Sequence, residues 1–280
     1  MHWQIRDQTL ELDRPLVMGI LNMTPDSFSD GAQFETLDDA IRRAEQMIAD
    51  GADILDIGGE STRPGSLPVS PDEEVGRVVP VIQAVSKRFD IPVSVDTTKS
   101  AVAKAAIEAG ARIINDISGL RFDERLASIA AEHGTGLVLM HSRGDFAAMH
   151  KQEPVLEIVP EVMFGLVRSF TVAMQHGVKK EQIVPDIGLG FGKTQSQNLE
   201  LIAKLGKLKD ELDGFPFLVG ASRKSFIGKL LGGAAVQNRL PGSVAAAVIA
   251  VWNGADIIRA HDVRETVEAI KVVAAIKKQI

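Results

Sequence analysis

Short apolar runs alternate with helical patterns about eight times along the chain, and nearly every run is followed by a polar residue. These runs, with the polar residues after them, are Leu16–Ile20 with Asn22, Ile54–Ile57 with Glu60, Val93–Val95 with Asp96, Ile113–Ile114 with Asn115, Leu137–Met140 with His141, Ile183–Val184 with Asp186, Phe217–Val219 with Ser222 and Lys224, and Ile257–Ile258 with Arg259 and His261. Eight strand–helix units are the arrangement of a (β/α)8 barrel. We therefore predict an α/β fold of the TIM-barrel type, whose C-terminal strand ends form one mouth.

The length of 280 residues fits a single barrel domain, and no linker interrupts the pattern. The segments His2–Ile5 and Thr9–Leu12 alternate in polarity around a polar turn, which predicts a small hairpin. We expect residues 1–15 to form this hairpin over the closed end of a barrel made by residues 16–280. Helices are predicted at Leu37–Ala49, Asp72–Arg88, Ser100–Ala109, Glu124–His133, Leu156–His176, Gln197–Lys207, Ser243–Trp252 and Val263–Lys278.

Composition excludes several functional classes. The chain has no Cys, so disulfides, thiolate metal ligands and a catalytic thiol are excluded. The formal net charge of -6 disfavours a general nucleic-acid or anionic-membrane surface. No stretch is apolar for long enough to span a bilayer. We expect a cytoplasmic protein without a nucleic-acid or membrane partner.

Two long loops, residues 23–34 and 60–71, follow the first two barrel strands and are rich in Asp, Ser, Pro and Gly. Loops of this length inside a compact domain are usually functional. They would lie at the same mouth as the polar residues that end the strands. We therefore expect both loops to contribute to a site there.

Asp96, Asn115 and Asp186 end three different strands and are expected to face one another across the mouth. Their oxygens suit a flat ligand edge that presents several N–H donors, such as an aminopyrimidinone. The same groups could instead hold a divalent metal, act as an acid and base pair, or cap the following helices. Three such residues at strand ends favour a site over three separate caps.

Basic residues follow the last two strands. Lys224 could form a Schiff base, bind phosphate or donate to a ligand carbonyl. The cations Arg223, Lys224 and Lys229 crowd a helix start, which the helix dipole disfavours unless a bound anion or electron-rich ligand offsets them.

Arg259 and His261 are two residues apart at the end of a strand, so they share one face of it. With Asn22 and Arg63 from the two loops, they could gather two phosphates. Asn22 could then supply one oxygen to a Mg²⁺ ion that keeps most of its waters.

The segment Gly188–Thr194 is close to a phosphate-binding loop, but Ile187 stands where that pattern requires Gly. The glycines more simply allow a ligand to approach the backbone, and Phe191 offers it an apolar face. The four histidines that fall in predicted helices or loops have no expected partner and are interpreted as structural or solvated: His2, His133, His150 and His176.

Residues 19–31, Gly-Ile-Leu-Asn-Met-Thr-Pro-Asp-Ser-Phe-Ser-Asp-Gly, resemble the first signature of the dihydropteroate synthase family. Residues 56–65, Asp-Ile-Gly-Gly-Glu-Ser-Thr-Arg-Pro-Gly, resemble its second. Shorter matches occur, in family order, at residues 94–97, 115–116, 140–141, 186–193, 222–225 and 259–261. The resemblance runs from about Leu16 to the end of the chain.

This resemblance implies a transferase that condenses 6-hydroxymethyl-7,8-dihydropterin diphosphate with p-aminobenzoate, giving 7,8-dihydropteroate and pyrophosphate in folate biosynthesis. It assigns to the pterin Asp56, Asp96, Asn115, Asp186, Lys224 and Arg259; to the diphosphate Asn22, Arg63 and His261; and to p-aminobenzoate Thr62, Pro64, Phe191, Ser225 and Phe28. Arg63, Lys224, Arg259 and His261 would be catalytic, and Asn22 would be a ligand of Mg²⁺. The resemblance also implies competitive inhibition by sulfonamides and a homodimer formed through the last helices.

Three positions depart from the family pattern, namely Ala32 in the first loop, Phe146 after the fifth strand and Ile187 after the sixth. None of them removes a ligand-holding residue. The alternative functions are a pterin-dependent methyltransferase, a lyase that uses Lys224 as a Schiff base, and a non-catalytic pterin-binding module.

Overall fold

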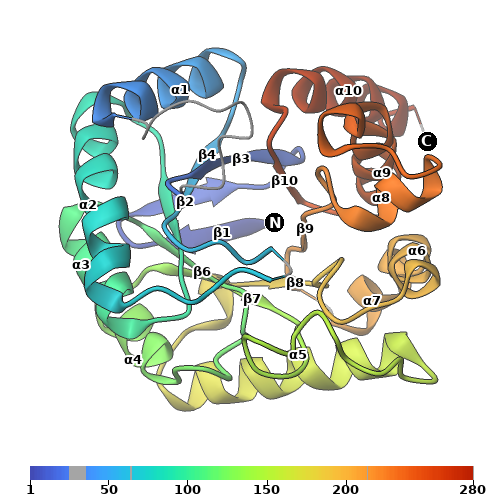
Figure 1. Ribbon diagram of the computed structural model, residues 1–280, viewed down its shortest axis with the longest axis horizontal. Coiled ribbons are helices and arrows are strands. Elements are labelled where there is room, and N and C mark those ends of the chain that lie inside the picture. The colour runs from blue at the N-terminus through green and yellow to red at the C-terminus, as the bar shows by residue number, and fades with distance from the viewer. Residues whose placement is uncertain (25–35, 64, 213, 280) are drawn as a thin grey trace.

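The computed structural model describes residues 1–24, 36–63, 65–212 and 214–279. Its eight parallel strands close into a barrel in the order β10-β3-β4-β5-β6-β7-β8-β9, so the predicted (β/α)8 fold is confirmed. Figure 1 shows the helices as an outer ring around the strands, running in chain order from α1 to α10. Because all barrel strands run in the same direction, their C-terminal ends meet at one mouth.

The barrel strands are short, and helices of several turns connect most of them. The strands are β3 (Leu16–Asn22), β4 (Ile54–Gly58), β5 (Val93–Asp96), β6 (Ile113–Asp116), β7 (Gly136–Met140), β8 (Ile183–Asp186), β9 (Leu218–Val219) and β10 (Ile257–Ala260). The helices are α1 (Leu37–Ala49), α2 (Pro71–Arg88), α3 (Ser100–Ala109), α4 (Arg125–His133), α5 (Ile158–Gln175), α6 (Gln195–Ala203), α7 (Leu205–Glu211), α8 (Ser225–Leu230), α9 (Leu240–Trp252) and α10 (Val263–Lys277).

The helix predicted over Gln197–Lys207 differs most from the structure. It begins at Gln195, because Thr194 caps it: the Thr194 hydroxyl accepts from Gln197 N at 3.2 Å, and the Gln197 side chain accepts from Thr194 N at 2.9 Å. It also divides at Lys204, which ends α6 and precedes α7. The apolar spacing continues across this break, so the pattern alone could not reveal it.

The barrel interior follows from the two-residue period of a strand. Seven inward-facing apolar side chains, one from each of seven strands, pack together inside the barrel on the side of the strands' N-terminal ends, which we call the lower barrel: Met18, Ile54, Ile113, Val138, Val184, Leu218 and Ile257. The alternate residues, such as Val17, Leu55 and Ile114, belong instead to the larger core between the strands and the helices. The next inward positions toward the mouth are therefore two residues further on, where the strands carry Asp56, Asn115, Asp186 and Arg259.

A hairpin of β1 (His2–Ile5) and β2 (Gln8–Glu11) precedes the barrel, as predicted. Trp3 and Ile5 are fully buried in the same cluster as the lower barrel residues, and Trp3 Nε1 donates to the Gln182 carbonyl at 2.8 Å. A Cβ at Gly136, the first residue of β7, would lie 2.6 Å from Ile5 and 2.9 Å from Trp3. The hairpin thus packs tightly on the N-terminal end of the barrel, opposite the mouth; the division at residue 15 stays a prediction.

None of the helices in the described ranges is both long enough and apolar enough to cross a lipid bilayer.

Truncating Trp3 should destabilise the barrel strongly. The Trp3→Ala variant removes a fully buried indole and leaves a cavity, so we expect a loss of about 3–5 kcal/mol of unfolding free energy in urea titrations. Phe164→Ala is the control, because Phe164 is 74% exposed and should change the same free energy by about 0.5 kcal/mol or less. Equal losses in the two variants would contradict the closure of the barrel by Trp3.

Candidate active site

Arg259 on β10 crosses the mouth to two carboxylates on neighbouring strands. Its Nε donates to Asp56 Oδ2 at 2.6 Å, and its Nη2 donates to Asp96 Oδ2 at 2.7 Å. Asn115 Nδ2 donates to the same Asp56 oxygen at 3.0 Å. No residue in the described part of the chain donates a hydrogen bond to the other Asp56 oxygen, Oδ1, which is buried. A ligand N–H group would satisfy that atom.

Burial sets the charges in this cluster. Burial raises the pKa of Asp96 to about 7, and the charges of Asp56, Glu74 and Asp116 act in the same direction against the opposing effect of Arg259. Burial lowers the pKa of Arg259, but the Asp56 and Asp96 carboxylates outweigh this effect, so its pKa is raised overall. The mouth therefore holds a permanent cation beside a carboxyl group that titrates near neutral pH.

The opposite side of the mouth carries Asp186 and Lys224. Asp186 Oδ1 accepts from Gly188 N at 2.7 Å, and burial raises the pKa of Asp186. Lys224 Nζ donates to the Leu189 carbonyl and lies 4.8 Å from the centre of the Phe191 ring. Burial lowers the pKa of Lys224 to about 8, although the Asp186 carboxylate raises it. Lys224 is thus a mostly protonated donor at pH 7.

The Gly-rich turn after β8 is folded by left-handed glycines and a buried lysine. Gly188, Gly190 and Gly192 have φ values of +64°, +83° and +62°. Lys193 Nζ donates to the carbonyls of His141, Gly188 and Phe191 at 3.2, 2.7 and 3.1 Å. Lys193 therefore stabilises the turn from within, unlike the lysine of a phosphate-binding loop.

His261 is held as a neutral hydrogen-bond donor. Its backbone N donates to Ser222 Oγ at 3.1 Å, and its Nδ1 lies 3.0 Å from the same hydroxyl. The hydroxyl accepts the first bond and can donate the second, which assigns the remaining proton to Nε2. Burial lowers the pKa of His261 to about 3, and the charges of Arg259, Arg223 and Arg63 add to this effect.

Asn22, at the end of β3, lies level with Asp96 on the rim of the mouth. In the strand register, Asn22 lies beside Gly58 on β4, and Gly58 lies beside Asp96 on β5. A Cβ at Gly58 would lie 3.4 Å from both Asn22 Oδ1 and Asp96 Cβ. The small residue between them leaves both polar side chains on the rim of one mouth.

The crowding of cations at the start of α8 has an internal explanation for Arg223. Arg223 Nε donates to Asp262 Oδ2 at 2.9 Å, within an ion pair. Asp262 therefore offsets the charge of Arg223, and the expectation that a ligand must do so was wrong for this residue. Lys224 is the member of the cluster that lies beside Asp186.

The interpretation of His150 as a residue without partners was also wrong. Its Nε2 lies 2.7 Å from the Thr62 carbonyl, its Nδ1 lies 3.3 Å from the Gly190 carbonyl, and its ring centre is 5.2 Å from that of Phe191. His150 therefore connects the second long loop to the Gly-rich turn. His176 likewise has a partner, with Nδ1 2.9 Å from Ser128 Oγ.

The remaining predicted residues have different outcomes. Phe28, Pro64 and the divergent Ala32 lie outside the described residues. Ser225 is exposed as the first residue of α8. The divergent Phe146 packs on an apolar cluster that the sequence pattern did not predict, which comprises Ile117, Met140, Met149 and Phe191. This cluster gives the mouth an apolar wall.

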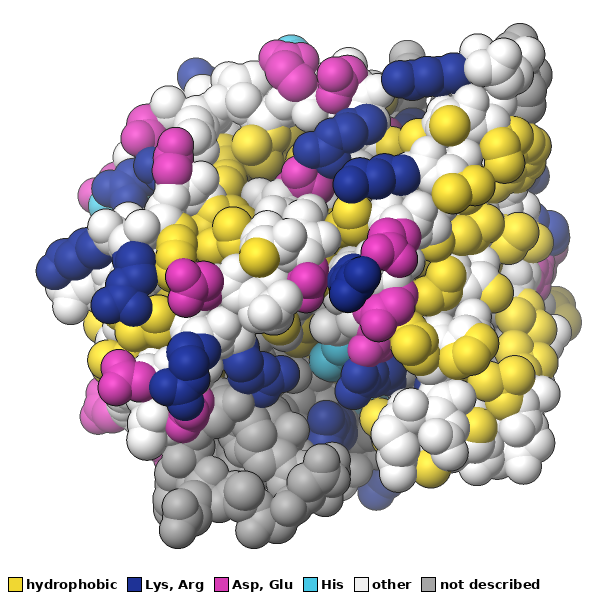
Figure 2. Space-filling view, turned by 90° about the horizontal axis from the view of Figure 1, so that it is seen from above, with side chains coloured by type: hydrophobic (Ala, Val, Ile, Leu, Met, Phe, Trp, Pro, Cys, Tyr) yellow, Lys and Arg dark blue, Asp and Glu magenta, His cyan; other side chains and the backbone are white. Residues whose placement is uncertain are grey.

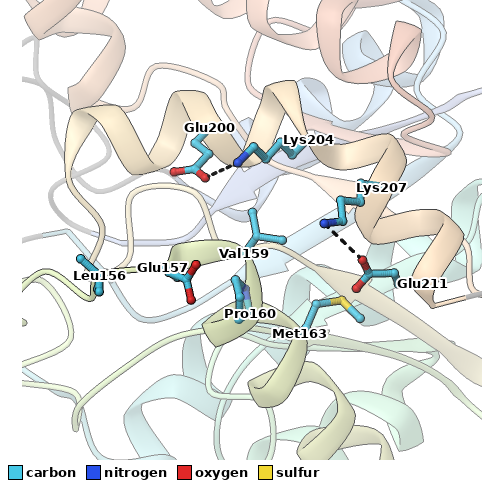
Figure 3. Close-up of a pocket in the computed structure, with 9 residues that line it drawn as sticks. All are labelled: Leu156, Glu157, Val159, Pro160, Met163, Glu200, Lys204, Lys207 and Glu211. Atoms are coloured by element: carbon cyan, nitrogen blue, oxygen red, sulfur yellow. Dashed lines mark hydrogen bonds and ion pairs between the residues drawn. The ribbon is translucent and has the colours of Figure 1, made fainter.

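A cavity of about 580 Å³ lies away from the mouth, between α5 and the α6–α7 pair (Figure 3). None of the candidate site residues lines it. Four of its five charged side chains pair with one another, Lys204 with Glu200 at 2.7 Å and Lys207 with Glu211 at 3.7 Å. We assign it no part in the chemistry.

Comparisons with known proteins agree with the arrangement of the mouth. Residues 18–261 match the family model described as pterin binding enzyme. The dihydropteroate synthase of Escherichia coli strain K12 is 46% identical over 267 residues, which are 95% of this chain and 93% of the relative.

Solved structures agree with the sequence matches. The crystal structure of Yersinia pestis dihydropteroate synthase in complex with a sulfonamide drug has a TM-score of 0.93 at 45% identity, covering 99% of this chain and 100% of the other. The Xanthomonas albilineans dihydropteroate synthase with 4-aminobenzoic acid has a TM-score of 0.91 at 42% identity, covering 99% of both chains. The chain belongs to the dihydropteroate synthase family of pterin-binding enzymes.

Proposed function

We propose that this chain condenses 6-hydroxymethyl-7,8-dihydropterin diphosphate with p-aminobenzoate, giving 7,8-dihydropteroate and pyrophosphate. The observation that carries the proposal is the buried cluster of Asp56, Asp96 and Asn115 around Arg259. A pterin-dependent methyltransferase or a simple pterin-binding module has no diphosphate to expel. The placement of Arg63 and His261 near each other favours the synthase, since both suit a leaving anion.

The pterin would take the place of the Arg259 guanidinium between the carboxylates. Its N–H edge matches the oxygens of Asp96 and Asp186 and the vacant lone pairs of Asp56 Oδ1. Lys224 Nζ would donate to the pterin carbonyl. Arg259, released from the carboxylates, would lie against the ring and toward the diphosphate, where its charge is favourable.

In the reaction, the bond between the pterin methylene carbon and the diphosphate oxygen breaks, and its electron pair leaves with the diphosphate. Arg63 and the Nε2–H of His261 would stabilise that charge. The carboxylates of Asp96 and Asp186 would stabilise the positive charge left on the pterin. The amine of p-aminobenzoate then forms the new C–N bond and loses a proton. Water would otherwise capture the cation, so the reaction requires water to be excluded from the mouth.

For the second substrate we propose a pocket between the Gly-rich turn and the second loop. Phe191 supplies an apolar face, and His150 brings Thr62 beside it. Ser225, at the start of α8, would complete the pocket. The family resemblance adds Pro64 and Phe28, which lie outside the described residues. Sulfonamides resemble p-aminobenzoate in shape and charge, so they would compete for the same pocket. The similarity to synthases with a bound sulfonamide drug or 4-aminobenzoic acid supports this.

Mg²⁺ is proposed as the cofactor, held chiefly by the substrate. No group of three His, Asp or Glu side chains within the described ranges could hold a metal ion alone. Asn22 Oδ1 offers one oxygen on the rim, which fits an ion that takes its other ligands from diphosphate oxygens and water. When bound, Mg²⁺ would neutralise part of the charge on the leaving diphosphate.

We also propose a homodimer through the C-terminal helices. Six large apolar side chains on α8, α9 and α10 or directly after α8 are 44–60% exposed: Leu230, Leu231, Ile249, Trp252, Val272 and Ile276. Figure 2 shows hydrophobic side chains gathered along the side of the molecule that carries these helices. A second copy of the chain, with the same surface, could cover this face by two-fold symmetry.

Sedimentation velocity tests the dimer. We expect a species of two 30.1 kDa chains, which the double variant Ile249→Glu, Val272→Glu converts to a monomer because each buried charge opposes association. Phe164→Glu, a similar change on the outer face of α5, is the control and should remain dimeric. A monomeric wild-type protein at about micromolar concentration, or dissociation of the control, would contradict this proposal.

Pyrophosphate release tests the reaction. With p-aminobenzoate present, the wild-type protein should release pyrophosphate from the pterin diphosphate over many turnovers. Arg63→Ala should lower kcat on the order of 100-fold, since it removes charge stabilisation of the leaving group, whereas the exposed Arg168→Ala should leave kcat unchanged. Pterin binding without release would support the binding module. A borohydride-trapped adduct on Lys224 would support the lyase instead.

The titration of Asp96 predicts pH-dependent pterin binding. Its pKa of about 7 lies above the usual value for Asp, so the carboxyl becomes protonated as the pH falls through 7. Pterin affinity, which needs the carboxylate, should fall about tenfold between pH 8 and pH 6. Asp96→Asn should weaken binding about 10- to 100-fold and abolish this dependence, whereas the exposed Asp38→Asn should change neither. Calorimetric titration with 6-hydroxymethylpterin measures both, and an unchanged pH profile in Asp96→Asn would refute the assignment.

A further inference from the structure

Three charged side chains beside the mouth form a buried cluster for which the proposed reaction has no use. Lys99 Nζ lies 2.8 Å from Glu60 Oε1 and 2.5 Å from Glu74 Oε2. The side chains of Glu60 and Glu74 are 7% and 0% exposed, and that of Lys99 is 21% exposed. The three residues come from the second long loop, from α2 and from the segment between β5 and α3. This cluster therefore joins the loop to two fixed elements.

Lys99 occupies a position where a lysine costs helix stability. It is the N-cap residue of α3, a place that favours Ser, Thr, Asp or Asn, and its side chain makes no capping hydrogen bond. A cation is also disfavoured at the positive end of the helix dipole. The cap comes instead from Asp123, whose Oδ2 accepts from Ser100 N at 3.0 Å. The ammonium of Lys99 is thus available for the two glutamates.

Glu60 closes the loop that carries Thr62 and Arg63. The oxygen that meets Lys99, Oε1, also accepts from Val69 N at 2.8 Å, nine residues along the chain. The start of the loop is fixed as well: a Cβ at Gly59 would lie 2.8 Å from Val78 and 3.0 Å from Glu74, both on α2. One ammonium therefore holds both ends of the loop in place through Glu60.

The balance of charge makes this arrangement depend on Lys99. Burial raises the pKa of Glu74, and the hydrogen bond from Lys99 opposes that effect. The pKa of Lys99 is raised overall, because its bonds to the two glutamates outweigh its burial. Without Lys99, two buried carboxylates would lie close together with no cation between them. Glu60 would then turn toward water and release Val69 N.

We propose that Lys99 is a positioning residue that fixes the two ends of the second long loop, at Glu60 and Val69, and thereby sets the affinity for the arylamine substrate rather than for the pterin. This inference rests on the proposed function, which places Thr62 beside the arylamine and Arg63 beside the diphosphate. The pterin is held by carboxylates on the barrel strands, which do not depend on the loop. Loss of Lys99 should therefore weaken binding of the arylamine and leave binding of the pterin almost unchanged.

The test combines kinetics with a spin label on the loop. The chain has no Cys, so Leu67→Cys, at a side chain that is 83% exposed, gives one labelling site for a nitroxide. Lys99→Met in this background should sharpen the electron paramagnetic resonance spectrum and raise the KM for p-aminobenzoate on the order of tenfold or more. At pH 9, where the Asp96 carboxyl is ionised, the Kd for 6-hydroxymethylpterin should stay within about twofold of the wild-type value.

Matched variants separate loop positioning from general damage to the fold. Lys104→Met, an exposed lysine on α3, should change none of the three readouts. Lys99→Arg should restore the broad spectrum in part. If Lys99→Met does not fold, Glu60→Gln keeps the side-chain length, removes the ion pair, and should produce the same changes in smaller degree.

Two results would overturn the proposal: an unchanged label spectrum in Lys99→Met or Glu60→Gln, or a loss of pterin affinity as large as the rise in KM. The spectra need no turnover. A wild-type protein that releases no pyrophosphate would refute the proposed function, while the spectra would still decide whether Lys99 holds the loop.

Discussion

The structure of the mouth depends on one interaction, the bridge from Arg259 to Asp56 and Asp96. Two carboxylates on adjacent strands would repel each other in a buried site, and the guanidinium between them offsets that repulsion with hydrogen bonds of 2.6 and 2.7 Å. The bridge uses one oxygen of each carboxylate, and Asn115 shares the oxygen of Asp56. A flat ligand with several N–H donors can replace the guanidinium without leaving either carboxylate unpaired.

Barrel closure and the site arise from the same alternation along the strands. An apolar side chain in the lower interior and a polar one in the mouth are two residues apart on one strand, as in Ile54 with Asp56 and Ile257 with Arg259. The hairpin residue Trp3 buries the opposite end of this interior. The apolar residues that stabilise the barrel thus lie toward the N-terminal end of each strand, and the polar residues of the site lie at its C-terminal end. This division explains how such short strands can contribute to both.

The barrel and the position of Asp96, Asn115 and Asp186 at its mouth could be predicted from the sequence, because both depend on local periodicity and on the shared direction of parallel strands. Asp56 was assigned to the site only through the family resemblance. Three features could not be predicted. His150 has partners 88 and 40 residues away, and no local pattern reports contacts at that distance. Arg223 is paired by Asp262, which lies 39 residues further on. Lys99 contradicts the usual chemistry of a helix start, and this local inconsistency was the only signal of its long-range role.

The central claim is that a bound pterin displaces the Arg259 guanidinium and hydrogen-bonds to the ionised carboxylate of Asp96. Calorimetry of 6-hydroxymethylpterin binding at pH 7, repeated in buffers of different ionisation enthalpy, counts the protons exchanged. Since Asp96 has a pKa of about 7 in the free protein, the account predicts release of a fraction of a proton on binding. Binding with no proton exchange, or with net proton uptake, would contradict it.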